Sequence, residues 1–454
     1  MQEKSQSYTA DDVEGLGEAT PAEKQARNVA QNYFPPSTRA AHPRGVLYQG
    51  EFETQSDGTA RAVRLHARAL AATGIPLLLR SFSNVVVTDG VAEPVFVAGM
   101  PASTQVEVGH LLNTDIATFR PIIKHVVIRS AEHLRQLLVP KGAVPKDPND
   151  TQQQLELRDK LYGNAIVYSV WERDRIDPAI AKHLARVKQC WVPCQQNALM
   201  LIKSGVPAER VHVVPHPYDE DGSFAVHRRR VPGIFRITTA ARAPEARDRG
   251  QKRFYSIGRW EPRKNFVQLI QAFMRAFPGA ALENAMLTIK YSGNGQWPGY
   301  MTVTQAQQLV RDCGFSQCIK LIGGTVDSSR ISQLHFENNI YVSASHGEAF
   351  CLPAFDAKLA GNRLVYVPWG GVCDFAADDD LPVPHSMEPA HTSYRWEHGA
   401  QWAACGLEDL TEALRRVTVP EKYELPARFE ERFGLAAVGR KMRDLVDSTA
   451  YQKM

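Results

Sequence analysis

The chain has 454 residues, of which 44% are hydrophobic and 22% are charged, and its 53 Lys and Arg residues against 49 Asp and Glu residues give a net charge of +4. This balance is typical of a globular protein and excludes a disordered or fibrous chain. The length predicts two domains, since one domain usually has about 100–200 residues. The small net charge permits a polyanionic partner without requiring one.

The distribution of apolar residues predicts a cytoplasmic protein with no transmembrane segment. No apolar run approaches the roughly 18–20 residues that a membrane span needs, and the first twenty residues include Lys4, Asp11 and Glu14. The seven cysteines are an odd number spread thinly along the chain, which favours reduced thiols over a disulfide framework.

Residues 1–44 form a polar N-terminal extension rich in Ser, Gln, Glu and Thr. From residue 45 to 217, short apolar runs alternate with apolar residues at helical spacing, which predicts parallel α/β structure. The expected strands of this half are 46–48, 77–79, 85–87, 95–97, 123–128, 165–170 and 211–214. The expected helices are one that contains Val63, Ala67 and Leu70, and two at 178–189 and 195–204.

Residues 218–252 interrupt this alternation, and we interpret them as a basic interdomain linker or insertion. Arg228, Arg229 and Arg230 follow one another there. We expect the basic stretch 227–253 to lie at the cleft where the domains join, where it would either be a solvated surface or seat a polyanion.

A second alternating series fills residues 253–425, and residues 426–454 contain a last helical stretch at about 427–446. The strands of the 253–425 series are expected at 254–257, 286–290, 319–322 and 339–343, and its helices at 265–277 and 304–312. The fold class is therefore α/β, with two Rossmann-like parallel-sheet domains facing a cleft. Sheets of this kind bind ligands at the carboxyl ends of their strands.

The first motif follows the first expected strand of the second half and reads Gly258-Arg259-Trp260-Glu261-Pro262-Arg263-Lys264-Asn265. Glycine permits a tight turn, the start of the next helix offers free N–H groups, and Arg259 and Lys264 add two cations. This combination suits a diphosphate. In the alternative interpretation, both cations are solvated loop residues.

The second motif reads Ser345-His346-Gly347-Glu348-Ala349-Phe350-Cys351-Leu352-Pro353-Ala354-Phe355-Asp356-Ala357. Pro353 is a favourable first helical residue, which predicts Glu348 in the loop before a helix and Asp356 in its first turns. Both acids can then face hydroxyl groups of a ligand above the helix start. In the alternative interpretation, Asp356 only complements the helix dipole.

In order and spacing, the two motifs resemble the retaining glycosyltransferases of the GT-B fold, in the family 4 (group 1) type that uses nucleotide sugars. The resemblance extends from about residue 165 to residue 446. It implies that Arg259 and Lys264 grip the donor diphosphate, and that Glu348 lies near the transferred sugar. The implied donor-binding residues are Gly58, Gly258, Arg259, Lys264, Gly324, Glu348, Ala349, Phe350, Leu352 and Asp356. Asp356 stands where the family usually has a ribose-binding Glu, and its side chain is shorter.

Before residue 165, only Gly50 to Gly58 resemble the family, in its glycine-bearing first loop. His110, His125 and His133 are candidates for a catalytic histidine, and we place His133 on the acceptor side together with Glu172, which ends an expected strand. In the alternative interpretation, these are structural histidines and a surface ion pair.

The resemblance implies a metal-independent transferase that moves a sugar from a nucleoside-diphosphate sugar to a hydroxyl acceptor with retention of anomeric configuration. Glu348, Arg259 and Lys264 are the implied catalytic residues. No cofactor is expected besides the nucleotide sugar itself, and no metal site. The expected acceptor is a saccharide or a lipid-linked glycan, with peripheral contact to a membrane face as an option. Three alternatives stay open: transfer to a hydroxymethylated DNA base, a GT-B-shaped epimerase, and a non-catalytic module that binds a nucleotide sugar or a nucleic acid.

An acidic triplet, Asp378-Asp379-Asp380, resembles the metal-binding motif of the other major glycosyltransferase fold. It precedes Leu-Pro-Val-Pro instead of ending a strand. We therefore expect a solvated loop there and not a metal site.

Overall fold

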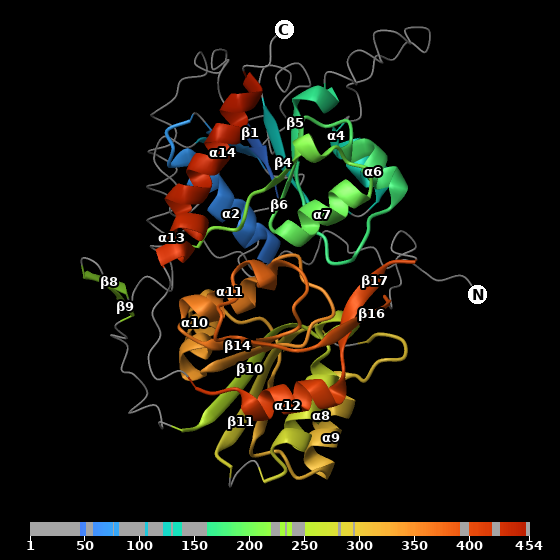
Figure 1. Cartoon of the computed structure of the whole chain (residues 1–454), viewed down its shortest axis with the longest axis vertical. Helices are drawn as coiled ribbons and strands as arrows, with labels where there is room; N and C mark the ends of the chain where they lie inside the picture. Colours follow the sequence, from blue (N-terminus) through green and yellow to red (C-terminus); the bar gives the residue numbers. More distant parts are fainter. Residues whose placement is uncertain are drawn as a thin grey trace, which may run out of the picture.

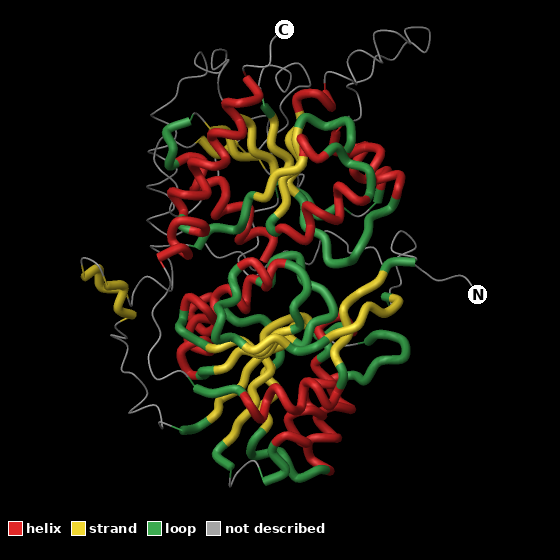
Figure 2. The backbone as a smooth tube through the Cα atoms, in the orientation of Figure 1, coloured by secondary structure: helices red, strands yellow, loops and turns green. Residues whose placement is uncertain are grey.

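The structure of the chain is a computed structural model, and its helices and strands build two α/β domains stacked along the long axis of the molecule (Figure 1, Figure 2). The residues that it describes are 46–50, 58–75, 77–80, 105–107, 121–128, 130–138, 161–218, 228–231, 234–237, 250–279, 283–293, 296–390, 399–419 and 427–450. The expected extension at 1–44 and the expected strands at 85–87 and 95–97 lie outside these residues.

The N-terminal domain is built on a seven-stranded sheet in the order β3-β2-β1-β4-β5-β6-β7, and all its neighbouring strands are parallel. The strands are β1 (Val46–Gln49), β2 (Leu77–Arg80), β3 (Gln105–Glu107), β4 (Ile122–His125), β5 (Ala165–Tyr168), β6 (Gln189–Val192) and β7 (Val211–Val213). The helices are α2 (Gly58–Ala71), α4 (Ala131–Leu138), α6 (Pro178–Leu184) and α7 (Gln195–Lys203). Strands β1, β4, β5 and β6 are buried along their whole length, as expected where helices cover both faces of a parallel sheet.

The C-terminal domain repeats this architecture with a six-stranded parallel sheet in the order β12-β11-β10-β13-β14-β15. The strands are β10 (Lys252–Arg259), β11 (Ala285–Ser292), β12 (Ile319–Ile322), β13 (Ile340–Ser343), β14 (Arg363–Tyr366) and β15 (Leu381–Pro382). The helices are α8 (Phe266–Ala276), α9 (Val303–Asp312), α10 (Ser328–Glu337), α11 (Leu352–Leu359) and α12 (Leu407–Arg416). Strands β16 (His385–Pro389) and β17 (Gln401–Cys405) form an antiparallel pair beside this sheet.

In both sheets the strand order reverses at the same place. The fourth strand of each series returns to the first, so that β4 pairs with β1 and β13 pairs with β10. Loops that follow two such strands diverge to opposite faces of the sheet and leave a crevice at its carboxyl edge. The predicted fold class, two doubly wound parallel-sheet domains, is confirmed.

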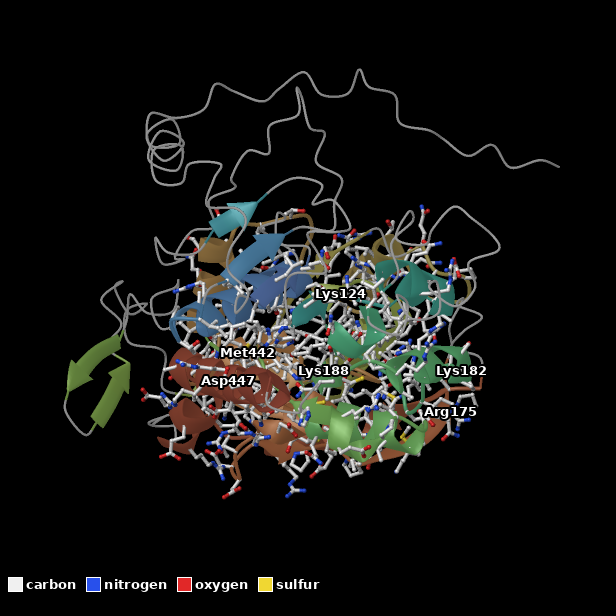
Figure 3. The ribbon with its side chains drawn as sticks, turned by 90° about the horizontal axis from the view of Figure 1, so that it is seen from above. Lys124, Arg175, Lys182, Lys188, Met442 and Asp447 are labelled. Atoms are coloured by element: carbon white, nitrogen blue, oxygen red, sulfur yellow. The ribbon has the colours of Figure 1, made fainter. Side chains whose placement is uncertain are left out.

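The end of the described chain returns to the N-terminal domain. Helix α13 (Ala427–Phe433) is followed by α14 (Leu435–Ala450), which packs along α2. A Cβ on Gly439 would lie within 3.0 Å of the carbonyl oxygen of Ala69, so the two helices approach each other closely. Val438, Met442 and Val446 of α14 belong to the same buried core as β1, and Met442 is labelled in Figure 3.

One expected helix is wrong in its second half. The stretch 178–189 was expected to be helical throughout, but α6 ends at Leu184 and strand β6 begins at Gln189. The amide of Val187 still bonds the carbonyl of Leu184, which continues the helical spacing of apolar residues into a turn. The apolar run Cys190-Trp191-Val192 then pairs with β5 and β7, because a fully buried central strand stabilises this segment more than a longer helix does.

The basic stretch contains a hairpin of its own. Strands β8 (Arg228–Val231) and β9 (Ile234–Ile237) pair with each other in antiparallel fashion. Figures 1 and 3, which differ by a quarter turn, both show this hairpin apart from the two domains. The expectation that the stretch 227–253 lies at the cleft is therefore wrong for the hairpin, whose two strands pair with each other and with neither large sheet.

The acidic triplet is only partly solvated. Asp378 and Asp379 are exposed, but Asp380 is buried and its carboxylate lies 2.8 Å from Nζ of the buried Lys358. The same carboxylate accepts hydrogen bonds from the backbone N–H groups of Leu364 and Ala377, each at 2.8 Å. Asp380 therefore anchors β14 to the loop before β15, and the expectation of a fully solvated loop is wrong for this residue.

Candidate functional site

Two loops meet at the carboxyl edge of the C-terminal sheet, where it faces the N-terminal domain. Lys264 ends a short 3₁₀ turn, Pro262–Lys264, after β10, and Glu348 lies in the loop between β13 and α11. Because β10 and β13 are neighbouring strands, the two side chains lie close together although they are 84 positions apart in the sequence. Nζ of Lys264 lies 2.5 Å from Oε1 of Glu348.

Glu348 is held as a buried anion. Its side chain is 8% exposed, and its second oxygen, Oε2, lies 3.2 Å from Nη1 of Arg263. Burial alone would raise the pKa of Glu348, but Lys264 and Arg263 together lower this pKa to about 2. The carboxylate is therefore ionised throughout the physiological pH range.

Two glycines pack closely against the backbone of the loop that carries Glu348. Gly370 has a φ of +83°, and a Cβ there would lie within 3.0 Å of the carbonyl oxygen of Glu348. A Cβ on Gly371 would likewise lie within 3.0 Å of the carbonyl oxygen of Ala349. The pair Gly370-Gly371 thus supports the loop that presents Glu348, and any larger residue would displace it.

Arg263 joins three carboxylates at this edge. Its Nε lies 3.0 Å from Oε2 of Glu172, and its Nη2 lies 2.6 Å from Oε1 of Glu261, in addition to the contact with Glu348. Glu172 follows β5 of the N-terminal domain, so this guanidinium ties the two domains together. Arg263 was not among the expected site residues, because nothing in its turn motif indicates that Glu172 of the other domain and Glu348 lie within its reach.

The other expected donor residues gather at the same edge. Arg259 ends β10 with an exposed side chain, and Gly258 before it packs so closely that a Cβ would lie 3.2 Å from Cδ of Lys264. Gly324, with a φ of +90°, follows β12, which is separated from β10 by β11. The structure therefore brings Gly258, Lys264 and Glu348 together, with Arg259 at the end of the same strand as Gly258 and Gly324 further along the carboxyl edge.

Asp356 lies across from α2 and not beside an open space. Its side chain is 3% exposed, and both oxygens of its carboxylate bind the guanidinium of Arg61, with Nη2 at 2.8 Å from Oδ1. Gly58, at the start of α2, lies beside α11 as well, since a Cβ there would be 3.5 Å from Cδ1 of Leu352. The structure thus brings Gly58 and Leu352 together, while the carboxylate of Asp356 forms an ion pair with Arg61.

We expect Arg61→Ala to lower the stability of the chain. The substitution leaves the buried carboxylate of Asp356 without this bidentate cation, and the free energy of unfolding should fall by up to about 3 kcal/mol. This is the low end of the range for buried ion pairs, because the side chain of Arg61 is 29% exposed. Thermal melting of Arg61→Ala, Asp356→Ala and the double variant measures the coupling. Strictly additive shifts in melting temperature would contradict the paired geometry.

Three buried histidines of the N-terminal domain lie together where that domain meets the Glu348 loop. The ring centroid of His66 lies 5.4 Å from that of His125 and 5.1 Å from that of His216. His216 packs edge-on against Phe350 of the Glu348 loop, at 4.8 Å between centroids, and Nδ1 of His125 is 2.8 Å from the hydroxyl of Tyr48. Burial lowers the pKa of all three histidines, that of His66 to about 4. The candidate His125 is thus a neutral member of a packed core.

We expect the stability of the chain to fall as the pH is lowered from about 6.5 to 4. In the unfolded chain these histidines bind protons near their ordinary pKa of about 6.5, whereas in the folded chain they bind them only at lower pH. The unfolded state therefore binds more protons over this range, and acid favours it. Melting temperatures between pH 7.5 and 4.5 measure the slope, which His66→Gln should flatten. An unchanged slope in that variant would show that His66 does not contribute.

Of the two acceptor-side candidates, the structure brings only Glu172 to this site. Partial burial and the nearby charge of Glu348 raise the pKa of Glu172, while Arg263 opposes them. His133 lies on α4, which packs against α6 and not against the loops that carry Lys264 and Glu348 (Figure 1). His110 lies outside the described residues.

The site offers cations and carboxylates but shows no metal-binding cluster. Within the described part of the chain, no group of three or more His, Cys, Asp or Glu is arranged to hold a metal ion. Within the same part, no helix has both the length and the apolar character that crossing a membrane requires. Chemically, two cations and a fixed anion at a sheet edge can bind a phosphate group next to a polyhydroxylated ligand.

Solved structures show which fold this is. HepE of Anabaena, in complex with UDP and glucose, is 11% identical, and the likeness covers 89% of this chain and 100% of HepE with a TM-score of 0.57. The α,α-trehalose 6-phosphate synthase from Burkholderia multivorans is 13% identical over 90% of this chain and 99% of its own, with a TM-score of 0.52. A glycosyltransferase from Rickettsia africae is 12% identical over 91% and 100%, with a TM-score of 0.53.

These likenesses show that the chain has the GT-B fold of glycosyltransferases. No protein-family model matches the sequence, and a comparison with curated protein sequences gives no match.

Proposed function

We propose that the chain is a glycosyltransferase that moves a sugar from a nucleoside-diphosphate sugar to a hydroxyl acceptor with retention of configuration. The observation that carries this proposal is the pair Lys264 and Glu348 at the carboxyl edge of the second sheet, with the exposed Arg259 at the end of β10. The GT-B fold supports it. UDP-glucose is the first donor to test, because the HepE structure holds UDP and glucose.

In the proposed reaction, the donor diphosphate draws Lys264 away from Glu348 and also engages Arg259. As the bond between the sugar C1 and the diphosphate oxygen breaks, negative charge grows on the leaving group, and the two cations stabilise it. The acceptor oxygen bonds to C1, and its proton passes to the leaving phosphate. The backbone N–H groups of Ala349, Phe350 and Leu352, near the start of α11, supply further donors for the phosphates.

Departure of Lys264 leaves Oε1 of Glu348 available to a sugar hydroxyl. We place the acceptor on the N-terminal side, where Glu172 follows β5, and propose a saccharide or a lipid-linked glycan as its class. Since Arg259 and Lys264 supply the positive charge, we assign no metal ion to the reaction, and transfer is expected to continue in the presence of EDTA.

Thermal unfolding with a panel of nucleoside diphosphates and nucleotide sugars tests the proposal. A ligand at 100 times its dissociation constant adds about 2.7 kcal/mol of stability, which is readily visible as a shift in melting temperature. Donors that shift the melting temperature are then incubated with saccharide and lipid-linked acceptors, and release of the nucleoside diphosphate is followed. A panel in which no nucleotide shifts the melting temperature and no nucleotide sugar is consumed would overturn the proposal.

A further inference from the structure

We propose that Arg263 positions Glu348 for the donor sugar and makes that position depend on closure of the two domains, through its ion pair with Glu172. The inference rests on the proposed function and adds to it a positioning residue. Neither Arg259 nor Lys264 can take this role, because in the proposed complex both are engaged with the diphosphate.

The guanidinium of Arg263 holds the loop that presents Glu348. Nη1 of Arg263 donates to the carbonyl oxygen of Gly347 at 2.6 Å and lies 3.2 Å from Oε2 of Glu348. The side chain is 13% exposed. Nη1 thus holds both the backbone before Glu348 and the carboxylate itself, while Nε and Nη2 of the same planar group reach Glu172 and Glu261. The single nitrogen of an ammonium cannot cover three such directions.

The main chain of Arg263 holds the same loop. Its carbonyl oxygen accepts the N–H of His346 at 2.8 Å and the hydroxyl of Ser345 at 3.1 Å. The segment 345–348 is therefore bound to Arg263 by backbone and side chain together. A displacement of Arg263 is transmitted directly to Glu348.

Arg263 also contacts the N-terminal domain. Nε of Arg263 lies 3.0 Å from Oε2 of Glu172, and a Cβ on Gly347 would lie within 3.0 Å of the carbonyl oxygen of Glu172. The backbone after β5 thus rests on the loop that presents Glu348. Separation of the domains would remove both the contact and the ion pair, and Glu261, which already binds Nη2 at 2.6 Å, would hold the guanidinium without the opposing attraction of Glu172.

Glu348 binds two cations at once. Its Oε1 contacts Lys264 and its Oε2 contacts Arg263. When the diphosphate takes Lys264, Arg263 continues to hold Oε2 of Glu348, and Oε1 turns to the sugar. Arg263 therefore determines where the carboxylate lies at the moment of transfer, and Glu172 determines whether Arg263 is in place.

Kinetics of Glu172→Gln, with Asp174→Asn as the matched control, test the coupling. Asp174 lies on the same loop and also crosses to the C-terminal domain, but its Oδ1 accepts the backbone N–H of Gln401 at 2.6 Å and does not contact Arg263. We expect Glu172→Gln to lower kcat roughly five- to tenfold, within the usual range of coupling between sites, and to leave the Kd of the nucleoside diphosphate within about twofold. Asp174→Asn should leave kcat within about twofold.

The charge-conserving variant Arg263→Lys distinguishes positioning from a purely electrostatic role. Arg263→Lys and Arg263→Gln should lower kcat by similar factors, because neither can bridge Gly347, Glu348 and Glu172. In the wild type, kcat should fall at acidic pH, because the pKa of Glu172 is raised and its protonation breaks the ion pair with Arg263. Gln cannot be protonated in this range, so this fall should disappear in Glu172→Gln. Wild-type kcat in Arg263→Lys, or equal losses in Glu172→Gln and Asp174→Asn, would overturn the inference.

A readout that needs no turnover separates this inference from the proposed function. Melting temperatures of Glu172→Gln, Arg263→Gln and their double variant should be non-additive, because the two residues share one ion pair. Non-additive shifts in a chain that consumes no nucleotide sugar would retain the tie between the domains and reject the transferase. Additive shifts would reject the tie itself, whatever the activity.

Discussion

Lys264→Ala is expected to lower kcat/KM by roughly a hundredfold or more. The variant removes one preorganised cation from the leaving diphosphate, and the loss of one such donor raises the barrier by about 2.7–4 kcal/mol. In the free protein the substitution also removes the contact of 2.5 Å with Glu348, but Arg263 remains next to that carboxylate. The folded state should therefore persist, and steady-state kinetics with the preferred nucleotide sugar measure the effect.

A suitable control for Lys264→Ala is Lys320→Ala. Lys320 is a lysine of the same domain with an exposed side chain on β12. Its replacement should leave kcat/KM unchanged within about twofold. Unchanged turnover in Lys264→Ala itself would remove the diphosphate clamp from the proposed mechanism.

Glu348→Gln is expected to depress transfer by roughly a hundredfold and to leave the affinity for the nucleoside diphosphate nearly intact. Gln preserves the shape of the side chain and removes the charge, which in the wild type is present at any working pH because the pKa of Glu348 is lowered to about 2. Calorimetric titration with the nucleoside diphosphate and kinetics of transfer together give the two quantities. Equal losses in affinity and in kcat would place Glu348 against the nucleotide and not against the sugar.

Much of the C-terminal fold could be predicted because its strands are short apolar runs with clear boundaries. The expected strand at 319–322 coincides with β12, and those at 286–290 and 339–343 lie within two residues of the ends of β11 and β13. Pro353 likewise places the start of α11 within one residue. Since the carboxyl ends of parallel strands share one edge, the local pattern already places the loops of Lys264 and Glu348 at that edge. Their direct contact depends on the pairing of β10 with β13, which the sequence did not indicate.

The contacts between the domains could not be predicted in this way. Arg61 and Asp356 are 295 residues apart, and no periodicity in either segment indicates that they meet. Arg263 was hidden for a different reason: a loop arginine between a proline and a lysine has the composition of a solvated turn. Its role becomes visible only when β5 of one domain and the loop after β13 of the other are placed in contact.

The return of α14 to the N-terminal domain has a consequence for synthesis. Val438, Met442 and Val446 complete a core whose strands are translated far earlier, since β7 ends at Val213. At about 5–20 residues per second, roughly 10–50 s pass on the ribosome before α14 follows β7. Throughout that interval the nascent N-terminal half presents the apolar stripe of α2 without its covering helix. We expect this half to be a client of chaperones that shield exposed apolar surface until the last helix has left the ribosome.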